Sequence, residues 1–592
     1  MTPPLPSFAC CPAPAPCLPQ GDPEPEDRAA GIARARAGIA LSRRFAGLPF
    51  PDRVPGWAKP GPRFLAEAGR WSALAAANLA AAEARALATD ANASPSDLLR
   101  RAKRALFVRV QETLNGTSPA RRIAGWQERT PLATSAYRIF PLVPEPQALN
   151  RWRSDLWFAR ERVAGANPVM LEGVERLPAH VTLRPGDYAR AMDGDTLDAA
   201  LAERRLFQCD HGMLSGIEAG ITDGNRKFLE APWSLYALPR DRSALRPLAI
   251  QCTQAPTPGP LFFPWHGTAW RMARTVVQVS DSNLHGVVEH GVHCHLVMGL
   301  VAVCLHRSLA RRHPLSVLLL PHLELTLNVD HLTEGLYAPG GRTPTIQSVS
   351  ERGTLTLARW AYRSFDWSAD AVPERFVARR VSADVLPHYP ARDDLEAHGT
   401  VLRAFVRAYV RIYYASDGDV AGDGELQDFV RRLGDPDEGG LRGLGEVATV
   451  DALETFLVRA IQRATSYHAA INYSVYDAMG YAPNMPMAQF GPGPRHTDHP
   501  EEDFLAMLPP AAERDRQFND VFVVAQLRAN RLGHYPLEHF QDRRVRPLVR
   551  DFREALAELE HRIAMRNART EAAGGAPYTV LLPSRVTASV HV

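Results

Sequence analysis

The sequence predicts a mostly α-helical protein, and three features carry that prediction. Apolar residues recur at loosely helical spacing from about residue 64 to 115, where Ala, Leu, Arg and Glu dominate. Three further apolar stretches, 283–313, 397–416 and 448–480, are long enough for helices of several turns. Residues 150–280 mix short apolar runs with Pro and Gly and show little strand periodicity, so we expect alternating helices and loops there.

Composition and charge narrow the class of protein. The chain has 592 residues, of which 45% are hydrophobic, so it can form a large core. The formal net charge is only +3, and no basic stripe interleaved with aromatic residues occurs, so we expect no nucleic-acid partner. The small positive excess weakly favours attraction to anionic lipids or fatty carboxylates. We also expect a monomer.

Cysteine usage and the N-terminus bear on the compartment. There are seven cysteines and no CxxC pair, so the sequence indicates neither a disulfide framework nor a cysteine-based zinc site. The first 28 residues are rich in proline and lack the basic and apolar regions of a secretion signal. The longest apolar stretch, 296–305, is too short to span a bilayer. We therefore expect a cytoplasmic protein, with membrane association as an alternative only through peripheral contact.

These patterns divide the chain into three parts. Residues 1–35 form a Pro-rich flexible lead. Residues 36–135 form a helical N-terminal region, with a break expected near residues 92–95. We expect its helices to cover the core, and a lid or membrane-contact role is the alternative. We treat residues 136–592 as one mostly helical domain, in which the Gly- and Asp-rich stretch 416–445 is expected to be a surface loop.

His290 and His295 lie in an apolar segment that reads as one long helix. On a regular α-helix, a five-residue step places two side chains about 140° apart, so they could not easily share a metal ion. An inserted π-turn narrows this angle, and such turns gather at functional sites. His285 and His293 lie nearby and can be confused with ligands. Taken alone, this spacing is more typical of histidines that bind no metal.

A second apolar helix makes a metal site at these histidines more plausible. Its inward face follows a 3/4 spacing through Leu453, Leu457, Ile461, Ala464, His468 and Asn472. An imidazole and an amide buried in a core cost free energy unless each finds a partner. Side chains four residues apart lie on adjacent turns of one face and can reach one ion. The two helices together suggest a shared metal site, and histidines without a metal remain the alternative.

Longer segments around these residues carry a family resemblance. SYHAAINYSVYDAMGYAPNMP (Ser466–Pro486) closely resembles the metal-binding helix of lipoxygenases, and the segment from Asp281 to His322 resembles the partner helix and its continuation. Further similar segments are WRSDLWFARERVAGANPVML (Trp152–Leu171), LRPLAIQ with Trp270, and the C-terminal YTVLLPSRVTASVHV. The resemblance runs from about residue 136 to 592, and it implies a lipoxygenase-like catalytic domain built around two long metal-binding helices, of the short bacterial type without an N-terminal β-barrel.

The resemblance implies a ligand set of His290, His295, His468, Asn472 and the α-carboxylate of Val592. Asn472 matches a weak fourth position, and Val592 stands where the family usually ends in Ile. Such a set lacks thiolate, which disfavours copper(I) and iron–sulfur chemistry. Five protein ligands also exceed the four of a usual zinc site. We expect one iron ion, with manganese as the alternative.

The activity that the resemblance implies is dioxygenation of a polyunsaturated fatty acid of the linoleate or arachidonate class. A metal(III)-hydroxide takes a hydrogen atom from a bis-allylic carbon, and O2 then adds to the radical to give a lipid hydroperoxide. Metal-bound hydroxide does the acid–base work, so no side-chain base is needed. The alternatives are a hydroperoxide isomerase that forms epoxyalcohols and a non-catalytic lipid-binding descendant of the fold.

Substrate-pocket positions depart from the family pattern. A position that is usually a small Ala or Gly falls on or next to Thr333, and Leu336 matches a pocket leucine. Met485 stands where some members have an arginine for the fatty carboxylate, which puts head-group recognition at that position in doubt.

Two positions around the ligands also lack their usual polar side chains. Gly286 and Val475 stand where related enzymes can carry a hydrogen-bonded pair that orients the fourth ligand. We therefore expect Asn472 to be a loosely held ligand, with Glu289 or Tyr476 as candidate substitutes for the missing hydrogen bond.

Overall fold

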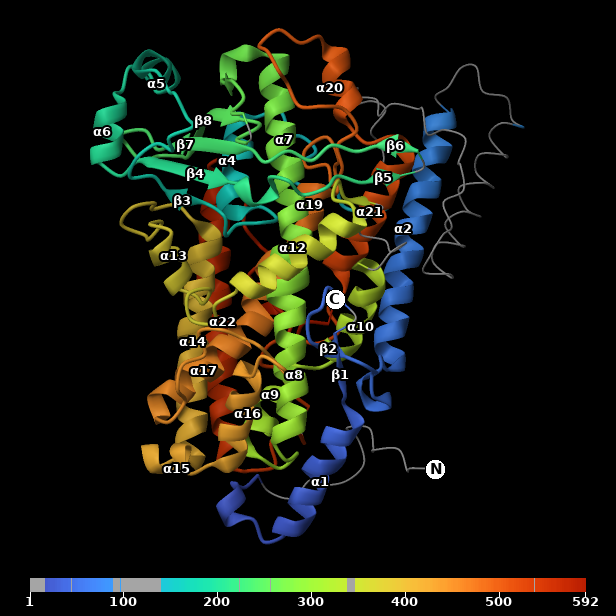
Figure 1. The fold of residues 1–592 in the computed structure, drawn as a ribbon, viewed down its shortest axis with the longest axis vertical. Coiled ribbons are helices and arrows are strands. Elements are labelled where there is room, and N and C mark those ends of the chain that lie inside the picture. Colours follow the sequence, from blue (N-terminus) through green and yellow to red (C-terminus); the bar gives the residue numbers. More distant parts are fainter. Residues whose placement is uncertain are drawn as a thin grey trace.

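One long helix forms the centre of the molecule. The computed structural model describes residues 16–43, 45–88, 96, 140–222, 224–255, 257–337, 346–536 and 538–591. Within them, the central helix consists of α7 (Thr268–Leu284), a π-helical segment (His285–Leu296) and α8 (Val297–Ser308), and it runs vertically through the body in Figure 1. The mostly α-helical class predicted from the sequence is confirmed.

This central helix is long and apolar enough to cross a membrane by length and composition alone. The longest apolar stretch in the sequence had suggested that no segment qualifies, but the helix continues over 41 residues. Its most apolar window is 94% buried inside the protein, which is the pattern of a core helix rather than of a lipid-facing one.

The second predicted helix is also present, and it too departs from regular α geometry. It consists of α17 (Val450–Gln462), a short π-helical segment (Arg463–Tyr467) and α18 (His468–Asn472), and α19 (Val475–Met479) comes next in the chain. α18 packs against the π-segment of the central helix. The two helices predicted to share a site are therefore neighbours.

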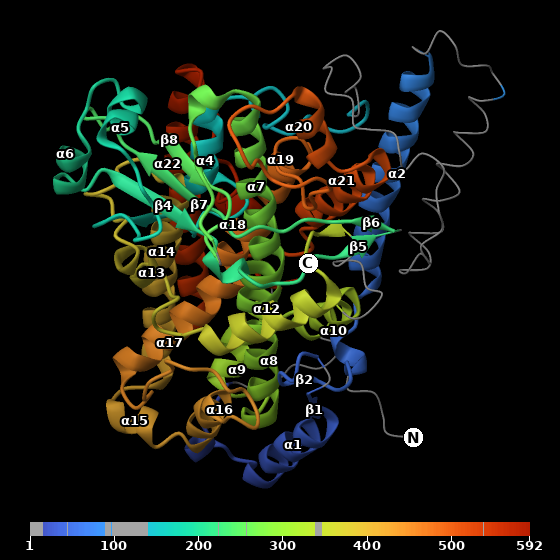
Figure 2. The same cartoon turned by 45° about the horizontal axis from the view of Figure 1, so that its top comes forward.

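Long helices enclose this pair on one side. α14 (Pro390–Tyr413) packs against both α17 and α22 (Val545–Ala572), and the three lie side by side in Figures 1 and 2. Thr449 begins α17 by accepting a hydrogen bond from the amide of Ala452, as an N-cap residue does. The core is continuous across these helices.

A five-stranded antiparallel sheet lies beside the upper part of the central helix, and its strand order is β3–β4–β7–β8–β9. The expectation of helices and loops without strands over 150–280 was wrong here. All five side chains of β7 are buried, so the strand shows no alternation of apolar and polar residues. The strands are β3 (Glu172–Gly173), β4 (Leu206–Asp210), β7 (Trp233–Ala237), β8 (Arg246–Gln251) and β9 (Leu261–Phe262).

The stretch 416–445 was predicted as a surface loop but contains two helices, α15 (Asp417–Ala421) and α16 (Gly424–Gly434). Asp423 begins α16 by accepting hydrogen bonds from two backbone amides, and its other carboxylate oxygen lies 2.9 Å from Nε2 of His313. Asp and Gly, which suggested a loop, here serve as helix caps.

The N-terminal part packs on the body where it is described. α1 (Pro25–Gly38) lies against α8, and Arg28 pairs with Asp22 and Glu425. The predicted boundary at residue 35 thus falls inside a helix, and the lead from residue 17 onward is anchored rather than free.

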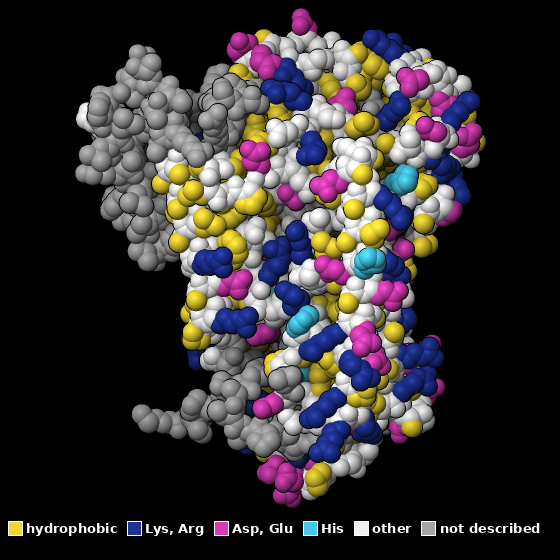
Figure 3. Space-filling view, turned by 180° about the vertical axis from the view of Figure 1, so that it is seen from behind, with side chains coloured by type: hydrophobic (Ala, Val, Ile, Leu, Met, Phe, Trp, Pro, Cys, Tyr) yellow, Lys and Arg dark blue, Asp and Glu magenta, His cyan; other side chains and the backbone are white. Residues whose placement is uncertain are grey.

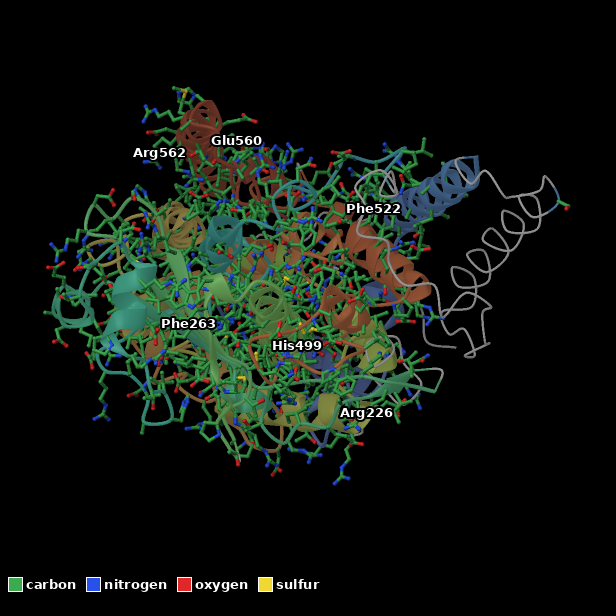
Figure 4. The ribbon with its side chains drawn as sticks, turned by 90° about the horizontal axis from the view of Figure 1, so that it is seen from above. Arg226, Phe263, His499, Phe522, Glu560 and Arg562 are labelled. Atoms are coloured by element: carbon green, nitrogen blue, oxygen red, sulfur yellow. The ribbon has the colours of Figure 1, made fainter. Side chains whose placement is uncertain are left out.

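α2 (Pro62–Ala88) packs along α21 (Ala511–Gln526), where Trp71 meets Phe522 edge-on at 6.1 Å between ring centroids. Figure 4 shows Phe522 on the side of the body that faces α2. The break expected near residues 92–95 lies outside the described residues.

The remaining elements complete the body. Acidic and basic side chains are interspersed over the rear face in Figure 3, in keeping with the small net charge. The remaining helices and strands are β1 (Leu41–Ser42), β2 (Phe50–Pro51), α4 (Asp155–Ala164), α5 (Pro185–Ala191), α6 (Leu197–Ala202), β5 (Ile221–Thr222), β6 (Asn225–Arg226), α9 (Pro314–Leu319), α10 (Thr326–Tyr337), α12 (Glu351–Ser364), α13 (Glu374–Ala378) and α20 (Glu501–Met507).

Candidate metal centre

Three imidazoles converge between the two central helices. His290 and His295 come from the π-segment and His468 is the first residue of α18; ligand atoms of the three lie within 4.8 Å of one another. The Nε2 atoms of His290 and His295 are 3.1 Å apart. The structure thus brings together three of the five residues that the sequence indicated as ligands.

The π-segment explains how a five-residue spacing produces this convergence. In a π-helix the backbone hydrogen bonds run from residue i to i+5, so residues five apart stand one turn apart on one face. The segment extends over 12 residues with both histidines inside it. The π-turn that two histidines at this spacing need in order to share a metal ion is therefore present, and it is longer than a single inserted turn.

The two other histidines of the π-segment make hydrogen bonds outside the three-histidine group. His285 Nε2 lies 3.0 Å from the carbonyl oxygen of Ile471, and burial lowers the pKa of this ring, so it is neutral and donates that hydrogen bond. His293 lies 3.2 Å from a carboxylate oxygen of Glu289. This resolves which histidines of the segment are candidates for a metal.

Asn472 ends α18 and is fully buried four residues after His468. Its amide nitrogen donates to the carbonyl oxygen of Val524 at 3.3 Å, whereas its amide oxygen accepts no hydrogen bond from any residue that the structure describes. Leaving such an oxygen buried and unsatisfied costs about 1–3 kcal/mol. A metal ion bound beside the histidines would satisfy it, so the residues present fit a metal.

The last predicted ligand, Val592, lies outside the described residues. The tail before it is held inside the body: the amide of Ala588 donates to Asn530 Oδ1 at 3.0 Å, and His591 is fully buried. The hydroxyl of Thr587 lies 3.3 Å from that of Tyr473, the residue directly after Asn472. The C-terminal tail therefore runs past the end of α18.

The predicted substitutes for the missing polar pair make other contacts. Tyr476 donates its hydroxyl hydrogen to the carbonyl of Pro144 at 2.5 Å, and Glu289 binds Arg375. Asn472 is oriented instead by the backbone of Val524 on α21. Sequence spacing alone cannot indicate this contact, because the two residues are 52 positions apart.

The two positions that lack polar side chains, Gly286 and Val475, are both part of the packed interior. A Cβ atom added at Gly286 would lie 2.1 Å from Nε2 of Gln347, so the side chain of Gln347 uses the room that the glycine leaves. Val475 is buried. Gln347 gave no signal in the sequence, because it lies on a separate segment before α12.

The predicted pocket residues are only partly described. Thr333 and Leu336 belong to α10, but their side chains lie outside the described residues, and Met485 is buried. A small cavity of about 10 Å³, room for roughly one water molecule, lies against the π-segment. It is lined by Phe45, Phe50, Val287, Gly291, Val292, Leu296, Asp330 and Ala358.

Among the described residues that line this cavity, Asp330 is the one that carries a carboxyl group. It is 1% exposed, and neither of its carboxyl oxygens has a hydrogen-bond partner among the described residues. Burial raises the pKa of this carboxyl well above its usual value, so it is a neutral acid. It sits over Gly299, where an added Cβ would overlap one of its oxygens.

Comparisons with known proteins show the family of this chain. A family model described as Lipoxygenase matches residues 132–583. Linoleate 9/13-lipoxygenase from Pseudomonas aeruginosa is 34% identical over 482 residues, covering 77% of this chain and 69% of that protein. Polyunsaturated fatty acid lipoxygenase ALOX8 from Mus musculus is 31% identical over 487 residues, covering 80% and 71%.

Solved structures show the same fold. The crystal structure of coral 8R-lipoxygenase superposes with a TM-score of 0.83 at 21% identity, covering 98% of this chain and 83% of that one. The matched range contains both helices with the three converging histidines and the buried amide. The chain belongs to the lipoxygenase family.

Proposed function

We propose that this protein is a lipoxygenase that adds O2 to a polyunsaturated fatty acid and forms a lipid hydroperoxide. One iron ion would be held by His290, His295 and His468, with Asn472 and the carboxylate of Val592 as further ligands. Manganese is the alternative ion. The observation that carries the proposal is the convergence of the three imidazoles on a π-segment, next to a buried amide oxygen that accepts no hydrogen bond within the described structure.

The substrate class comes from the relatives. The names of the bacterial and mouse proteins specify linoleate and polyunsaturated fatty acids. A bis-allylic carbon is common to these substrates, and its C–H bond is weak because the resulting radical is delocalised. When bound, iron supplies the one-electron oxidation that breaks this bond.

The residues of the chain supply the surroundings for that chemistry. Neutral imidazoles and an amide suit a divalent or trivalent ion, and the absence of thiolate from the proposed set suits iron in an oxygen-dependent reaction. Glu289 is the carboxylate next to His290, but it is engaged by Arg375 and Tyr467, so it is not available as a base for the substrate. Three apolar side chains of the π-segment, Val287, Val292 and Leu296, are buried and line the small cavity beside it.

Location and membrane contact are further parts of the proposal. We place the protein in the cytoplasm as a monomer. We also propose peripheral membrane contact through α2, because this helix lies on the outside of the body and carries Leu65, which is 57% exposed. An exposed leucine on a surface helix is the kind of residue that enters the interfacial region of a bilayer.

Oxygen uptake with two matched fatty acids tests the proposed function. Linoleate contains a bis-allylic carbon and oleate does not, so the metal-loaded protein should consume O2 with linoleate and form a hydroperoxide, and should be inactive with oleate. Consumption of added linoleate hydroperoxide under low oxygen, without O2 uptake from linoleate, would instead establish an isomerase. Inactivity with both linoleate and its hydroperoxide would leave only lipid binding.

A further inference from the structure

A fully buried polar cluster lies next to the three histidines. It consists of Glu289, Arg375 and Tyr467, with His293 at its edge. Glu289 immediately precedes His290, and Tyr467 immediately precedes His468. Each of the two helices therefore contributes a cluster residue directly beside a histidine of the centre.

The hydrogen bonds of the cluster connect the two helices. The hydroxyl of Tyr467 donates to a carboxylate oxygen of Glu289 at 2.8 Å. The guanidinium of Arg375 donates to that hydroxyl oxygen at 2.6 Å and binds both carboxylate oxygens of Glu289. The planar guanidinium thus contacts both partners of the Glu289–Tyr467 hydrogen bond at once, and its fixed fork of donors favours such bidentate binding of a carboxylate.

The charges of the cluster are balanced without solvent. Glu289 is 2% exposed and Arg375 is 5% exposed. The guanidinium of Arg375 donates to both carboxylate oxygens of Glu289, so the two opposite charges meet directly. Removing one partner of an ion pair this deeply buried strongly destabilises the fold, because the other charge is left uncompensated.

The cluster lies where both helices depart from α geometry. Glu289 belongs to the π-segment 285–296, and Tyr467 is the last residue of the π-segment 463–467. π-Turns are rare, and here they set the direction in which the histidines point. The hydrogen bonds of the cluster thus hold the two helices relative to each other one residue before His290 and one residue before His468.

Arg375 reaches the cluster from outside both helices. It belongs to α13, and Glu374 of the same helix pairs with Arg459 of α17 at 2.7 Å. Arg463 adds a second link, because it donates to the carbonyls of His293 and Asp370. α13 and the segment before it are therefore tied to both central helices.

We propose that Arg375 is a positioning residue, which fixes the Glu289–Tyr467 link between the two helices and thereby determines how firmly the three-histidine centre retains its metal ion. The proposal rests on the proposed function, because it assumes a metal at the three histidines. Groups that orient metal ligands typically change metal affinity by about tenfold to 100-fold when they are removed.

Three variants of the metal-loaded full chain test the proposal. Tyr467→Phe removes only the hydroxyl of the link. Arg375→Met removes the guanidinium and therefore the ion pair with Glu289. The double variant Glu289→Gln/Arg375→Met removes both charges, and the Gln side-chain oxygen can still accept from Tyr467. Tyr389→Phe is the matched control, because it also loses a buried hydroxyl. That hydroxyl lies outside the cluster and donates to the backbone carbonyl of Pro168.

The readout is the rate at which metal passes to excess EDTA, determined by elemental analysis, with thermal unfolding measured on the same samples. Tyr467→Phe and Arg375→Met should lose metal about tenfold faster than the unchanged protein. The double variant should release metal faster than the unchanged protein but more slowly than Arg375→Met, and Tyr389→Phe should release metal at the unchanged rate. Tyr467→Phe should unfold at nearly the same temperature as Tyr389→Phe, which separates metal retention from general loss of stability.

Unchanged metal release in Tyr467→Phe and in the double variant would overturn the proposal, even if Arg375→Met does not fold. Equal acceleration in Tyr467→Phe and Tyr389→Phe would also overturn it, because it would show a general effect of losing a buried hydroxyl. A protein that binds no metal in any form would instead contradict the proposed function, so the two failures are distinguishable.

Discussion

The Nε2 atoms of His290 and His295 lie 3.1 Å apart, although the residues are five positions apart in one helix. On a regular α-helix these side chains would diverge by about 140°. The π-helical segment brings them to one face, where His468 joins them. The candidate metal centre therefore depends on a local departure from α geometry as much as on the residue types.

Replacing one histidine of the centre should remove the metal. His295→Ala deletes an imidazole that meets both others, with its ring centroid 4.5 Å from that of His290 and 5.3 Å from that of His468. We expect little bound metal by elemental analysis and no O2 uptake with linoleate. His398→Ala is the control, because it also deletes a fully buried imidazole, one that contacts the carbonyl of Leu581. If both variants lose metal equally, the effect is one of folding and the assignment of His295 fails.

Asn472→Ala should weaken metal binding without abolishing it. A neutral amide oxygen is a weak ligand, and its nitrogen already donates to Val524. We expect a loss of about tenfold in metal affinity, or roughly 1.4 kcal/mol, in a competition titration with a chelator. Asn472→His should retain metal at least as well as the unchanged protein. An affinity unchanged in Asn472→Ala would show that the amide oxygen is not a ligand.

The C-terminal carboxylate should be essential, and the side chain of the residue that carries it should not be. A tag added after Val592 moves the carboxylate away, while Val592→Ile keeps it in place. We expect metal content and O2 uptake to fall in the tagged protein and to stay close to normal in Val592→Ile. The buried position of His591 leaves little room for an extension. Equal metal content in tagged and untagged protein would exclude the carboxylate as a ligand.

Asp330→Asn should change how stability depends on pH. Burial raises the pKa of Asp330 in the folded chain, whereas an unfolded aspartate has a pKa of about 3.9. Above about pH 4 the folded chain therefore binds a proton that the unfolded chain has released, and the free energy of unfolding falls as pH rises, by about 1.4 kcal/mol per unit until the folded pKa is reached. Asparagine does not titrate and lacks this loss.

Urea unfolding of both proteins at pH 5 and pH 8 measures the effect. The stability of Asp330→Asn relative to the unchanged protein should increase from pH 5 to pH 8. If the two pH profiles run parallel, Asp330 is not a neutral buried acid, and the small cavity beside the π-segment is more polar or more open than its lining indicates.

The two central helices and the π-turn could be predicted from the sequence for a simple physical reason. A run of apolar residues containing regularly spaced histidines has a periodicity that local geometry determines. The position of the Asn472 amide on the same face as His468 results from a four-residue step. These relations are local, but the spacing alone left histidines without a metal as the alternative, and the ligand set followed from the resemblance to lipoxygenases.

The parts that spacing did not predict depend on distant contacts. β7 is buried along its whole length and therefore lacks the alternation that marks a half-buried strand. Gln347 fills the room left by Gly286, 61 positions away. Arg375 binds Glu289 across 86 positions, and neither residue is unusual in the sequence. No local pattern signals such pairs, so they require the folded chain.

The three-histidine centre is tested most directly by measuring bound metal and linoleate-dependent O2 uptake in the same preparations of the unchanged protein and of His468→Ala. We expect about one iron or manganese ion per chain and rapid O2 uptake in the unchanged protein, and the loss of both in a folded His468→Ala. Full metal content and full O2 uptake in His468→Ala would contradict the assignment, because the site where the two helices meet would then not be the metal centre.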